Sequence, residues 1–365
     1  MYLLNNNDVK EIEETTFASI DIREKDLEEI LRKNINMICD PDDESMLIIG
    51  QQVANEKRAR SDLTAIDSDG NIVVIEIKRD LNDLKHRKER VEFQAIRYAA
   101  SCATINSIDT LVQEIFQPYV ENHLDEFSCD PYESLNSYQN SYQIAQRAVR
   151  EFMESNEIDP ENFNRKQRII LIASEFDDQT LSAAAWLNSN KINISCYEIK
   201  PYRTAGENII VDLKKILPLA KTSYEDFYIP IYSRRGSMVR SQVKRKVLLK
   251  IEDLLRLNLI KPDTVLVDTR LGTKATLLSD GSVRIASTGE IKSIQNWLKS
   301  IYNWSAVQSF KFLKVENTGK LLYDLREEYY ESDEEALDPD GETADQGSAD
   351  QSGDMSDTGS VDQNG

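Results

Sequence analysis

Two apolar segments joined by an Asp-Gly pair constrain the fold of this chain more than any other feature. Residues 61–68 (SDLTAIDS) and 71–79 (NIVVIEIKR) have the composition of strands, and Asp69-Gly70 between them is a strong hairpin signal. The continuous apolar run at 168–174 (RIILIAS) is typical of a buried central strand. Further strands are expected at 46–53 and 192–199, and helices at 24–38, 88–104 and 178–189. This order predicts the α/β class, with a mixed sheet flanked by helices.

Composition divides the 365 residues into four parts. We expect an α/β domain over 1–220 with a polar, helical insertion at 106–165, a basic linker at 221–246, a small α+β module over 247–330 and a tail at 331–365. The tail carries twelve acids and no Lys or Arg, and it has too few apolar residues to offset its ordering entropy, so we predict that it is disordered. Without those acids the formal net charge of −20 becomes −8.

Composition also disfavours several classes of protein. No apolar run approaches the ~18 residues that span a membrane, and no secretory signal is apparent, so a membrane partner is not expected. Four scattered cysteines without a CxxC pair favour a reduced, cytoplasmic setting. The chain has two histidines, so a zinc site is not expected, and any histidine-dependent catalysis would have to use His86 or His123.

The stretch at 233–250 has the opposite charge bias, with seven basic residues and no acid. Concentrated basic charge of this kind suits contact with a DNA backbone, so the acidic total does not exclude a nucleic-acid partner. A solvated linker leading into a helix explains the stretch equally well. The candidate nucleic-acid contacts here are Arg234, Arg235, Lys244, Arg245 and Lys246.

Three charged residues at the ends of the predicted hairpin strands form the candidate catalytic group. Glu76 and Lys78 lie two apart on one strand and therefore project to the same face, and the hairpin brings Asp62 alongside. Two carboxylates at the edge of an apolar sheet are costly to desolvate unless they hold a cation, and their oxygens suit Mg²⁺ or Mn²⁺. Such a metal would activate water and neutralise phosphate charge, and Lys78 could stabilise developing charge. The alternative is a structural ion pair.

Two neighbouring helices add further candidates. Gln94 and Tyr98 are four residues apart on one helical face, with Arg97 close to that face. The first helix places Glu28, and less clearly Glu24, at the margin of its apolar face. Each of these could also be an ordinary surface residue.

The string Asp62…Glu76-Ile77-Lys78, followed by the Gln94 to Tyr98 segment, resembles the PD-(D/E)XK nuclease superfamily, in particular its NucS and RecB-like branch. Ser61 stands where the family name has proline. The resemblance implies a restriction-endonuclease-like fold in which Asp62, Glu76 and the Ile77 carbonyl bind metal. It also implies that Lys78 is catalytic, that Gln94 supports the active site or DNA, and that Glu28 is the acid of the first helix. Tyr98 and Arg97 are then candidate contacts to nucleic acid.

The C-terminal module resembles a second family. Residues 249–326, with LLKIEDLLRLNLIKPDTVL, the Asp280-Gly281 turn and a final GKLLYDLR, are similar to the RAMA domain that accompanies restriction and modification enzymes. The resemblance implies a role in DNA recognition. The usual Asn-Gly-Trp segment is replaced by Ser309-Phe310-Lys311-Phe312, with Trp304 upstream. A small dimerisation or packing module is the alternative.

These observations favour a metal-dependent DNA endonuclease, in restriction and defence or in DNA repair. One alternative is a catalytically silent nuclease fold used for DNA binding or assembly, and another is an RNA-directed nuclease. The insertion at 106–165 either covers the active-site cleft or makes a subunit interface, which leaves a homodimer open.

Overall fold

The computed structural model describes residues 2–5, 8–39, 44–55, 60–79, 90–127, 137–204, 208–218, 224–229 and 249–336. A short hairpin of β1 (Tyr2–Asn5) and β2 (Asp8–Glu11) opens the chain. No helix in the described part of the chain combines the length and apolar character needed to cross a membrane.

A seven-stranded mixed sheet forms the centre of the larger domain, in the order β3-β8-β7-β6-β5-β4 with β9 also paired to β8. Its strands are β3 (Glu13–Glu14), β4 (Met46–Ala54), β5 (Arg60–Asp67), β6 (Ile72–Lys78), β7 (Arg168–Ala173), β8 (Asn193–Arg203) and β9 (Ile209–Leu217). β6, β7 and β8 run parallel, and the other pairs are antiparallel. The expected mixed α/β sheet is therefore confirmed. β9 and β3 were not expected from the sequence.

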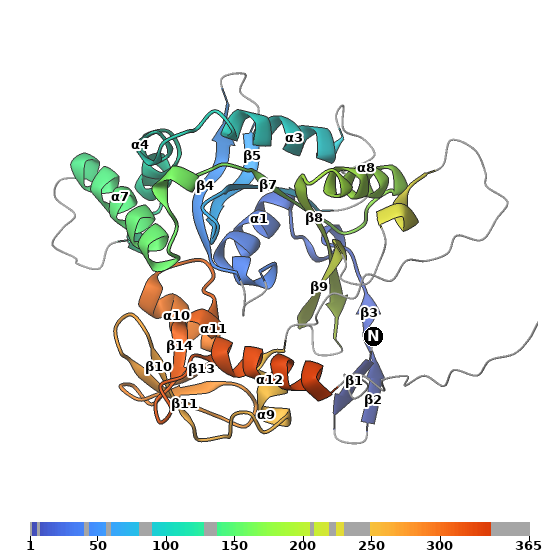
Figure 1. The fold of residues 1–365 in the computed structure, drawn as a ribbon. Coiled ribbons are helices and arrows are strands. Elements are labelled where there is room, and N and C mark those ends of the chain that lie inside the picture. The colour runs from blue at the N-terminus through green and yellow to red at the C-terminus, as the bar shows by residue number, and fades with distance from the viewer. Residues whose placement is uncertain are drawn as a thin grey trace, which may run out of the picture.

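Helices cover both faces of this sheet (Figure 1). α3 (Val91–Cys102) and α8 (Asp178–Ser189) pack on one face, where Val74 and Leu171 belong to their hydrophobic cluster. α1 (Glu24–Lys33) packs on the other face, in the cluster that contains Ile75 and Ile77. The alternation of β6 residues between the two clusters follows from the two-residue period of a strand. The helix expected at 24–38 is shorter, because it ends at Lys33 and gives way to a 3₁₀ turn at Ile35–Met37.

The Asp69-Gly70 turn joins β5 to β6 as predicted. Gly70 has φ +80°, and a Cβ there would lie 2.6 Å from Cγ2 of Ile158. Both the backbone conformation and the close approach of Ile158 therefore favour glycine at this position.

The insertion expected at 106–165 is helical where it is described. Its elements are α4 (Ile108–Leu111), a π-helix (Val112–Phe116), α5 (Gln117–Asn122), α6 (Leu124–Phe127), α7 (Ser137–Ser155) and a 3₁₀ turn (Pro160–Asn162). α5 contacts both α7 and β4, so the insertion borders the edge strand of the sheet.

The C-terminal module is built on a second, five-stranded sheet in the order β13-β12-β11-β10-β14. Its elements are α9 (Ile251–Arg256), β10 (Val265–Asp268), β11 (Lys274–Leu277), β12 (Val283–Ile285), β13 (Ile291–Lys292), α10 (Ile294–Tyr302), α11 (Ser309–Phe312), β14 (Leu313–Val315) and α12 (Leu322–Ala336). The helix expected at 247–260 stops at Arg256, because Asn258 adopts a left-handed backbone with φ +56°.

Two predicted boundaries differ from the structure. α12 continues to Ala336 and so includes the first residues of the predicted tail, while residues 337–365 lie outside the described residues. Within the predicted linker at 221–246, the 3₁₀ turn Tyr224–Phe227 packs on α8. The Tyr228 hydroxyl donates to Ser189 Oγ at 2.9 Å, so this end of the linker belongs to the larger domain.

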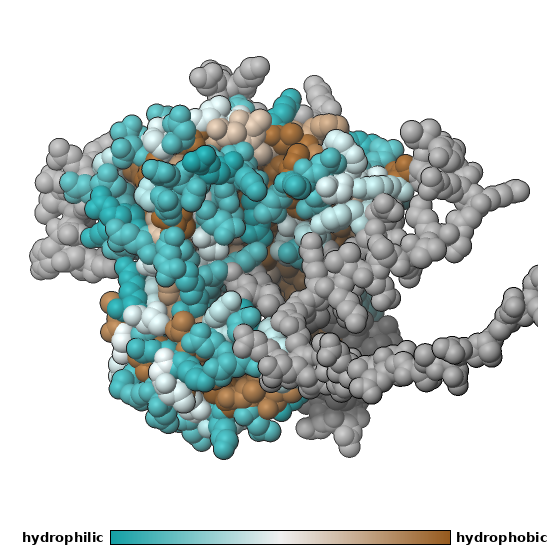
Figure 2. All heavy atoms as spheres, viewed as in Figure 1, coloured by the Kyte–Doolittle hydropathy of each residue, from teal (hydrophilic) through white to brown (hydrophobic). Residues whose placement is uncertain are grey.

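The two modules share one hydrophobic core. Met46 of β4 forms a β-bridge with Ala306, and the ring of Phe152 packs edge-on against Trp304 at 4.8 Å. Met46 lies opposite Asp67 at the turn end of the hairpin, so the contact is at the end of the sheet away from Asp62. Much of the face in Figure 2 is hydrophilic, with hydrophobic patches separated by polar side chains.

Candidate active site

Asp62, Glu76 and Lys78 meet at one end of the β5–β6 pair, as the hairpin predicts. Lys78 Nζ lies 2.6 Å from Glu76 Oε1 and 3.3 Å from Asp62 Oδ2. The same nitrogen donates to the Ile77 carbonyl at 2.7 Å. Asp62 Oδ2 also accepts the Ile77 backbone N–H at 2.7 Å. The three oxygens that the nuclease resemblance assigns to a metal, from Asp62, Glu76 and the Ile77 carbonyl, therefore converge on one ammonium group.

This charged group is buried. Glu76 and Lys78 are 0% exposed and Asp62 is 7% exposed, and every residue of β6 is buried. A charge removed from water is tolerated when it is paired and hydrogen-bonded, which is the situation here. The ammonium of Lys78 therefore lies within ion-pair distance of two carboxylates at once.

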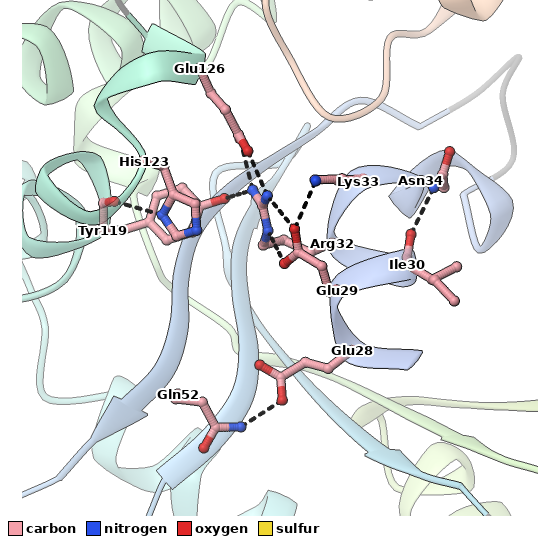
Figure 3. A network of polar contacts seen from close by, with 10 residues as sticks. All are labelled: Glu28, Glu29, Ile30, Arg32, Lys33, Asn34, Gln52, Tyr119, His123 and Glu126. Carbon is pink, nitrogen blue, oxygen red and sulfur yellow. Dashed lines mark hydrogen bonds and ion pairs between the residues drawn. The ribbon is translucent and has the colours of Figure 1, made fainter. Parts of the chain in front are cut away.

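Gln52 links this group to helix α1, and no sequence pattern pointed to it. Its Nε2 donates to Glu28 Oε2 at 2.7 Å and lies 3.2 Å from Asp62 Oδ1 (Figure 3 draws the Glu28 contact). Gln52 has φ +52°, and the β4–β5 register shifts between Ile48 and Gly50. An irregular edge strand thus carries the Gln52 amide between two carboxylates.

Glu28 is 3% exposed, and Glu24 lies farther out, with Oε1 3.9 Å from Lys78 Nζ. Burial raises the pKa of Glu28 above its ordinary value. Hydrogen bonding by Gln51 and Gln52 opposes this rise, while the charges of Asp62 and Glu24 add to it. A cation close to Glu28 would favour the ionised form and lower this pKa.

Helix α3 brings two more of the predicted residues to the site. Tyr98 is 5% exposed and belongs to the hydrophobic cluster under α3. Burial, with a further contribution from the charge of Glu76, raises the pKa of Tyr98 to about 12, while a hydrogen bond with Gln94 opposes the rise. Tyr98 is therefore close enough to respond to the charge of Glu76, Gln94 is half-buried one turn before Tyr98, and Arg97 is exposed on α3. The basic residues from Arg234 to Lys246 lie outside the described residues.

The donor set fits a hard divalent cation in its chemistry. Within the described ranges, no group of three or more His, Cys, Asp or Glu side chains is arranged to hold a metal ion. The set at this site is instead two carboxylates and one backbone carbonyl, all oxygen donors of the kind that Mg²⁺ and Mn²⁺ prefer. Lys78 Nζ occupies the point at which these oxygens converge, so a metal there would require the ammonium to move.

A cleft of about 830 Å³ adjoins this group on the α1 side of the sheet. Glu28 and Gln52 line it, and their contacts with each other and with Asp62 make the cleft continuous with the carboxylates. The opposite wall comes from the insertion, including Tyr119 and His123. The insertion therefore borders the candidate active site.

An ion-pair network around the buried Arg32 guanidinium fixes that wall against α1 (Figure 3). The Arg32 guanidinium contacts Glu29 at 2.8 Å and Glu126 at 2.6 Å, and its Nη1 donates to the Tyr119 hydroxyl at 2.7 Å. The bond to Glu126 and then the bond to Glu29 are the main causes that raise the pKa of Arg32. The Arg32 hydrogen bond, with a smaller contribution from Lys33, lowers the pKa of Glu29 to about 2.

Comparison with known protein families identifies the C-terminal module. Residues 233–335 match the family model RAMA, described as Restriction Enzyme Adenine Methylase Associated. The predicted RAMA resemblance over 247–330 is therefore confirmed, and the match extends into the segment predicted as a linker. No curated protein sequence matches the chain.

The aromatic residues at the atypical segment of this module are in its core. Trp304 is 4%, Phe310 is 0% and Phe312 is 6% exposed. Trp304 packs against Tyr302 and Phe312 of its own module as well as against Phe152 of the larger domain. These side chains stabilise the module and its junction, so surface recognition residues would have to lie elsewhere.

Proposed function

We propose that the protein is a metal-dependent DNA endonuclease. The observation that carries the proposal is the convergence of Asp62 Oδ2, Glu76 Oε1 and the Ile77 carbonyl oxygen on a single cationic position. This arrangement supports the resemblance of residues 62 to 98 to PD-(D/E)XK nucleases, including a restriction-endonuclease-like topology for the larger domain. The RAMA match to a restriction-associated family supports DNA as the substrate.

Asp62, Glu76 and the Ile77 carbonyl would hold Mg²⁺ or Mn²⁺, and Glu28 would contribute from α1. A metal bound there would supply an activated water and would neutralise charge on the scissile phosphate. Lys78 would then be free to stabilise the charge that develops on the phosphate during hydrolysis. Gln94 and Tyr98 would support the site from α3, because Tyr98 hydrogen-bonds with Gln94 and its pKa responds to the charge of Glu76.

The test uses plasmid, linear duplex, single-stranded DNA and RNA side by side, with Mg²⁺ or Mn²⁺. We expect DNA cleavage by the wild type, and its loss in Asp62→Ala and Glu76→Ala with the fold retained. Lys78→Ala should lower turnover by orders of magnitude and weaken DNA binding only slightly, because most affinity comes from phosphate contacts elsewhere. The exposed Glu175→Ala is the matched control. Full cleavage by the first two variants would place the active site elsewhere, and cleavage of RNA alone would make the enzyme an RNA-directed nuclease.

A second candidate is a catalytically silent nuclease fold used for DNA binding or assembly. The complete burial of Lys78 favours it, because this ammonium already pairs with one oxygen of each carboxylate. Under this alternative, the protein binds the DNA substrates of this test but cleaves none of them at any metal concentration. The Asp62 and Glu76 variants then bind DNA as the wild type does.

A further inference from the structure

The cleft beside the carboxylates has the size of a small-molecule site. Its volume of about 830 Å³ lies within the range typical of pockets that enclose one small organic ligand. An unpaired nucleotide can enter such a space, whereas a base that remains stacked and paired in a duplex cannot reach into it.

The cleft also lies next to the proposed reaction centre. Glu28 and Gln52 form part of its lining, and the Gln52 amide is 3.2 Å from Asp62. A phosphate bound at the carboxylates would therefore leave its neighbouring nucleotide at the mouth of the cleft.

The lining suits an uncharged polar ligand better than a second phosphate. Charged side chains are nearly balanced, with Glu24, Glu28 and Glu114 against Lys25 and Arg60. Three side-chain amides, those of Gln51, Gln52 and Asn122, accompany the imidazole of His123. Amide and imidazole groups each offer donors and acceptors, as the edge of a nucleobase does. Pro118 and Ile115 add apolar surface to the same wall.

His123 is held in one orientation. Its Nδ1 lies 2.9 Å from the Tyr119 carbonyl oxygen, which can only accept, so Nδ1 carries the proton. Its ring lies over the Tyr119 ring with centroids 4.3 Å apart, and Arg32 fixes the Tyr119 hydroxyl. In this tautomer Nε2 can accept a hydrogen bond, and the residues that the structure describes form no hydrogen bond to it.

We propose that this cleft receives one unpaired base of the DNA strand next to the scissile phosphate, and that His123 Nε2 and the Asn122 amide bind the edge of that base. The inference rests on the proposed nuclease function and narrows its substrate to DNA with unpaired nucleotides, such as single strands, flaps or gaps. The fixed orientation of His123 lowers the entropic cost of binding a base, because Tyr119 and Arg32 hold the imidazole in place before the base binds.

The test measures binding of the full-length protein to DNA in Ca²⁺, so that affinity is read separately from cleavage. The probe is a duplex with a short single-stranded extension, compared with a fully paired duplex and with the same extension made abasic at successive positions. We expect the wild type to prefer the extension, and one abasic position to lower affinity by about tenfold to a hundredfold.

Asn122→Ala and His123→Ala should lose this preference and become insensitive to the abasic position. Asn122 is exposed, and its Nδ2 donates to the Pro118 carbonyl one turn earlier in α5 at 2.9 Å, so its Oδ1 is the atom offered to a base. Its replacement removes only this local contact, and the exposed Gln113→Ala on the neighbouring π-helix is the matched control. Equal affinity of the wild type for the intact and abasic extensions would overturn the inference, as would unchanged base dependence in both variants.

The outcomes also separate the two proposals. Base-dependent binding without cleavage in Mg²⁺ or Mn²⁺ would support the proposed base-binding site and contradict the proposed nuclease activity. Metal-dependent cleavage, together with binding that no abasic position weakens, would support the proposed nuclease activity and contradict the proposed base-binding site.

Discussion

The side-chain amide of Gln52 donates to the carboxylate of Glu28 at 2.7 Å, and this contact ties helix α1 to the edge of the sheet. The same nitrogen lies 3.2 Å from Asp62, so one neutral side chain stands between two acids. Because Gln52 has a left-handed backbone, the position of this amide depends on the irregularity of β4 as much as on the residue type.

Replacing Gln52 should therefore destabilise the cluster of the Glu28 and Asp62 carboxylates. Without divalent metal, we expect Gln52→Ala to lower the free energy of unfolding by about 1–3 kcal/mol, because a buried acceptor of Glu28 loses its donor. Chemical denaturation in EDTA measures this, with the exposed Gln113→Ala as control. A Gln52→Ala variant as stable as the control would show that the amide contact contributes nothing.

Removing the buried ammonium should make the protein depend on an external cation. Lys78→Met keeps the length of the side chain but leaves two buried carboxylates unpaired, at a cost of about 3–5 kcal/mol in metal-free buffer. Added Mg²⁺ or Ca²⁺ should then raise the melting temperature more in Lys78→Met than in the wild type. The exposed Lys166→Met is the control, and an equal metal effect in all three proteins would argue against a metal at this position.

The junction between the two modules should be essential for stability. Trp304→Ala removes a buried ring that contacts Phe152, so we expect a loss of about 3–5 kcal/mol and a single melting transition for both modules. Trp186, which is 57% exposed on α8, provides the matched Trp186→Ala control, with an expected change within about 0.5 kcal/mol. Two separate transitions in the wild type would contradict this prediction.

Asp67, at the turn end of β5, should make stability depend on pH. Burial raises its pKa from 3.8 to about 6, so the folded protein holds this proton more tightly than the unfolded chain. Its contribution is therefore fully present below pH 3.8 and is lost as the pH rises to about 6, by about 3 kcal/mol. Asp67→Asn should remove this part of the pH profile, measured as the difference from wild type between pH 3.5 and about 6.5.

The control for that profile is Asp263→Asn, because Asp263 is exposed and its left-handed backbone tolerates asparagine equally well. A pH profile of Asp67→Asn parallel to that of the wild type would show that Asp67 titrates at the same pH in the folded and unfolded states.

The central hairpin and its charged residues were predictable because their signals are local. The Asp69-Gly70 turn sets the pairing of β5 with β6, and the two-residue period then places Glu76 beside Lys78. The small second sheet could also be anticipated, since its strands alternate between turns such as Asp280-Gly281. The roles of these residues in catalysis stay predictions.

Other features depend on contacts that a sequence pattern does not encode. Gln52 reaches its position through a left-handed residue and a register shift, neither of which has a signature in MLIIGQQVA. β3 is two residues long and owes its assignment to pairing with β8. The burial of Trp304 against Phe152 joins segments more than a hundred residues apart, so only the folded chain shows that this tryptophan is a junction residue.

The β-bridge between Met46 and Ala306 and the ring contact at Trp304 have an evolutionary consequence. Recombination that exchanged the C-terminal module for another would leave a cavity beside Phe152 and an unpaired backbone at the start of β4. A compatible replacement would have to inherit the segment from 302 to 308 together with its receiving surface. Substitutions at the contacts between the two modules are therefore expected to be compensated on the other side. Joining either module to an unrelated domain would require a redesigned interface.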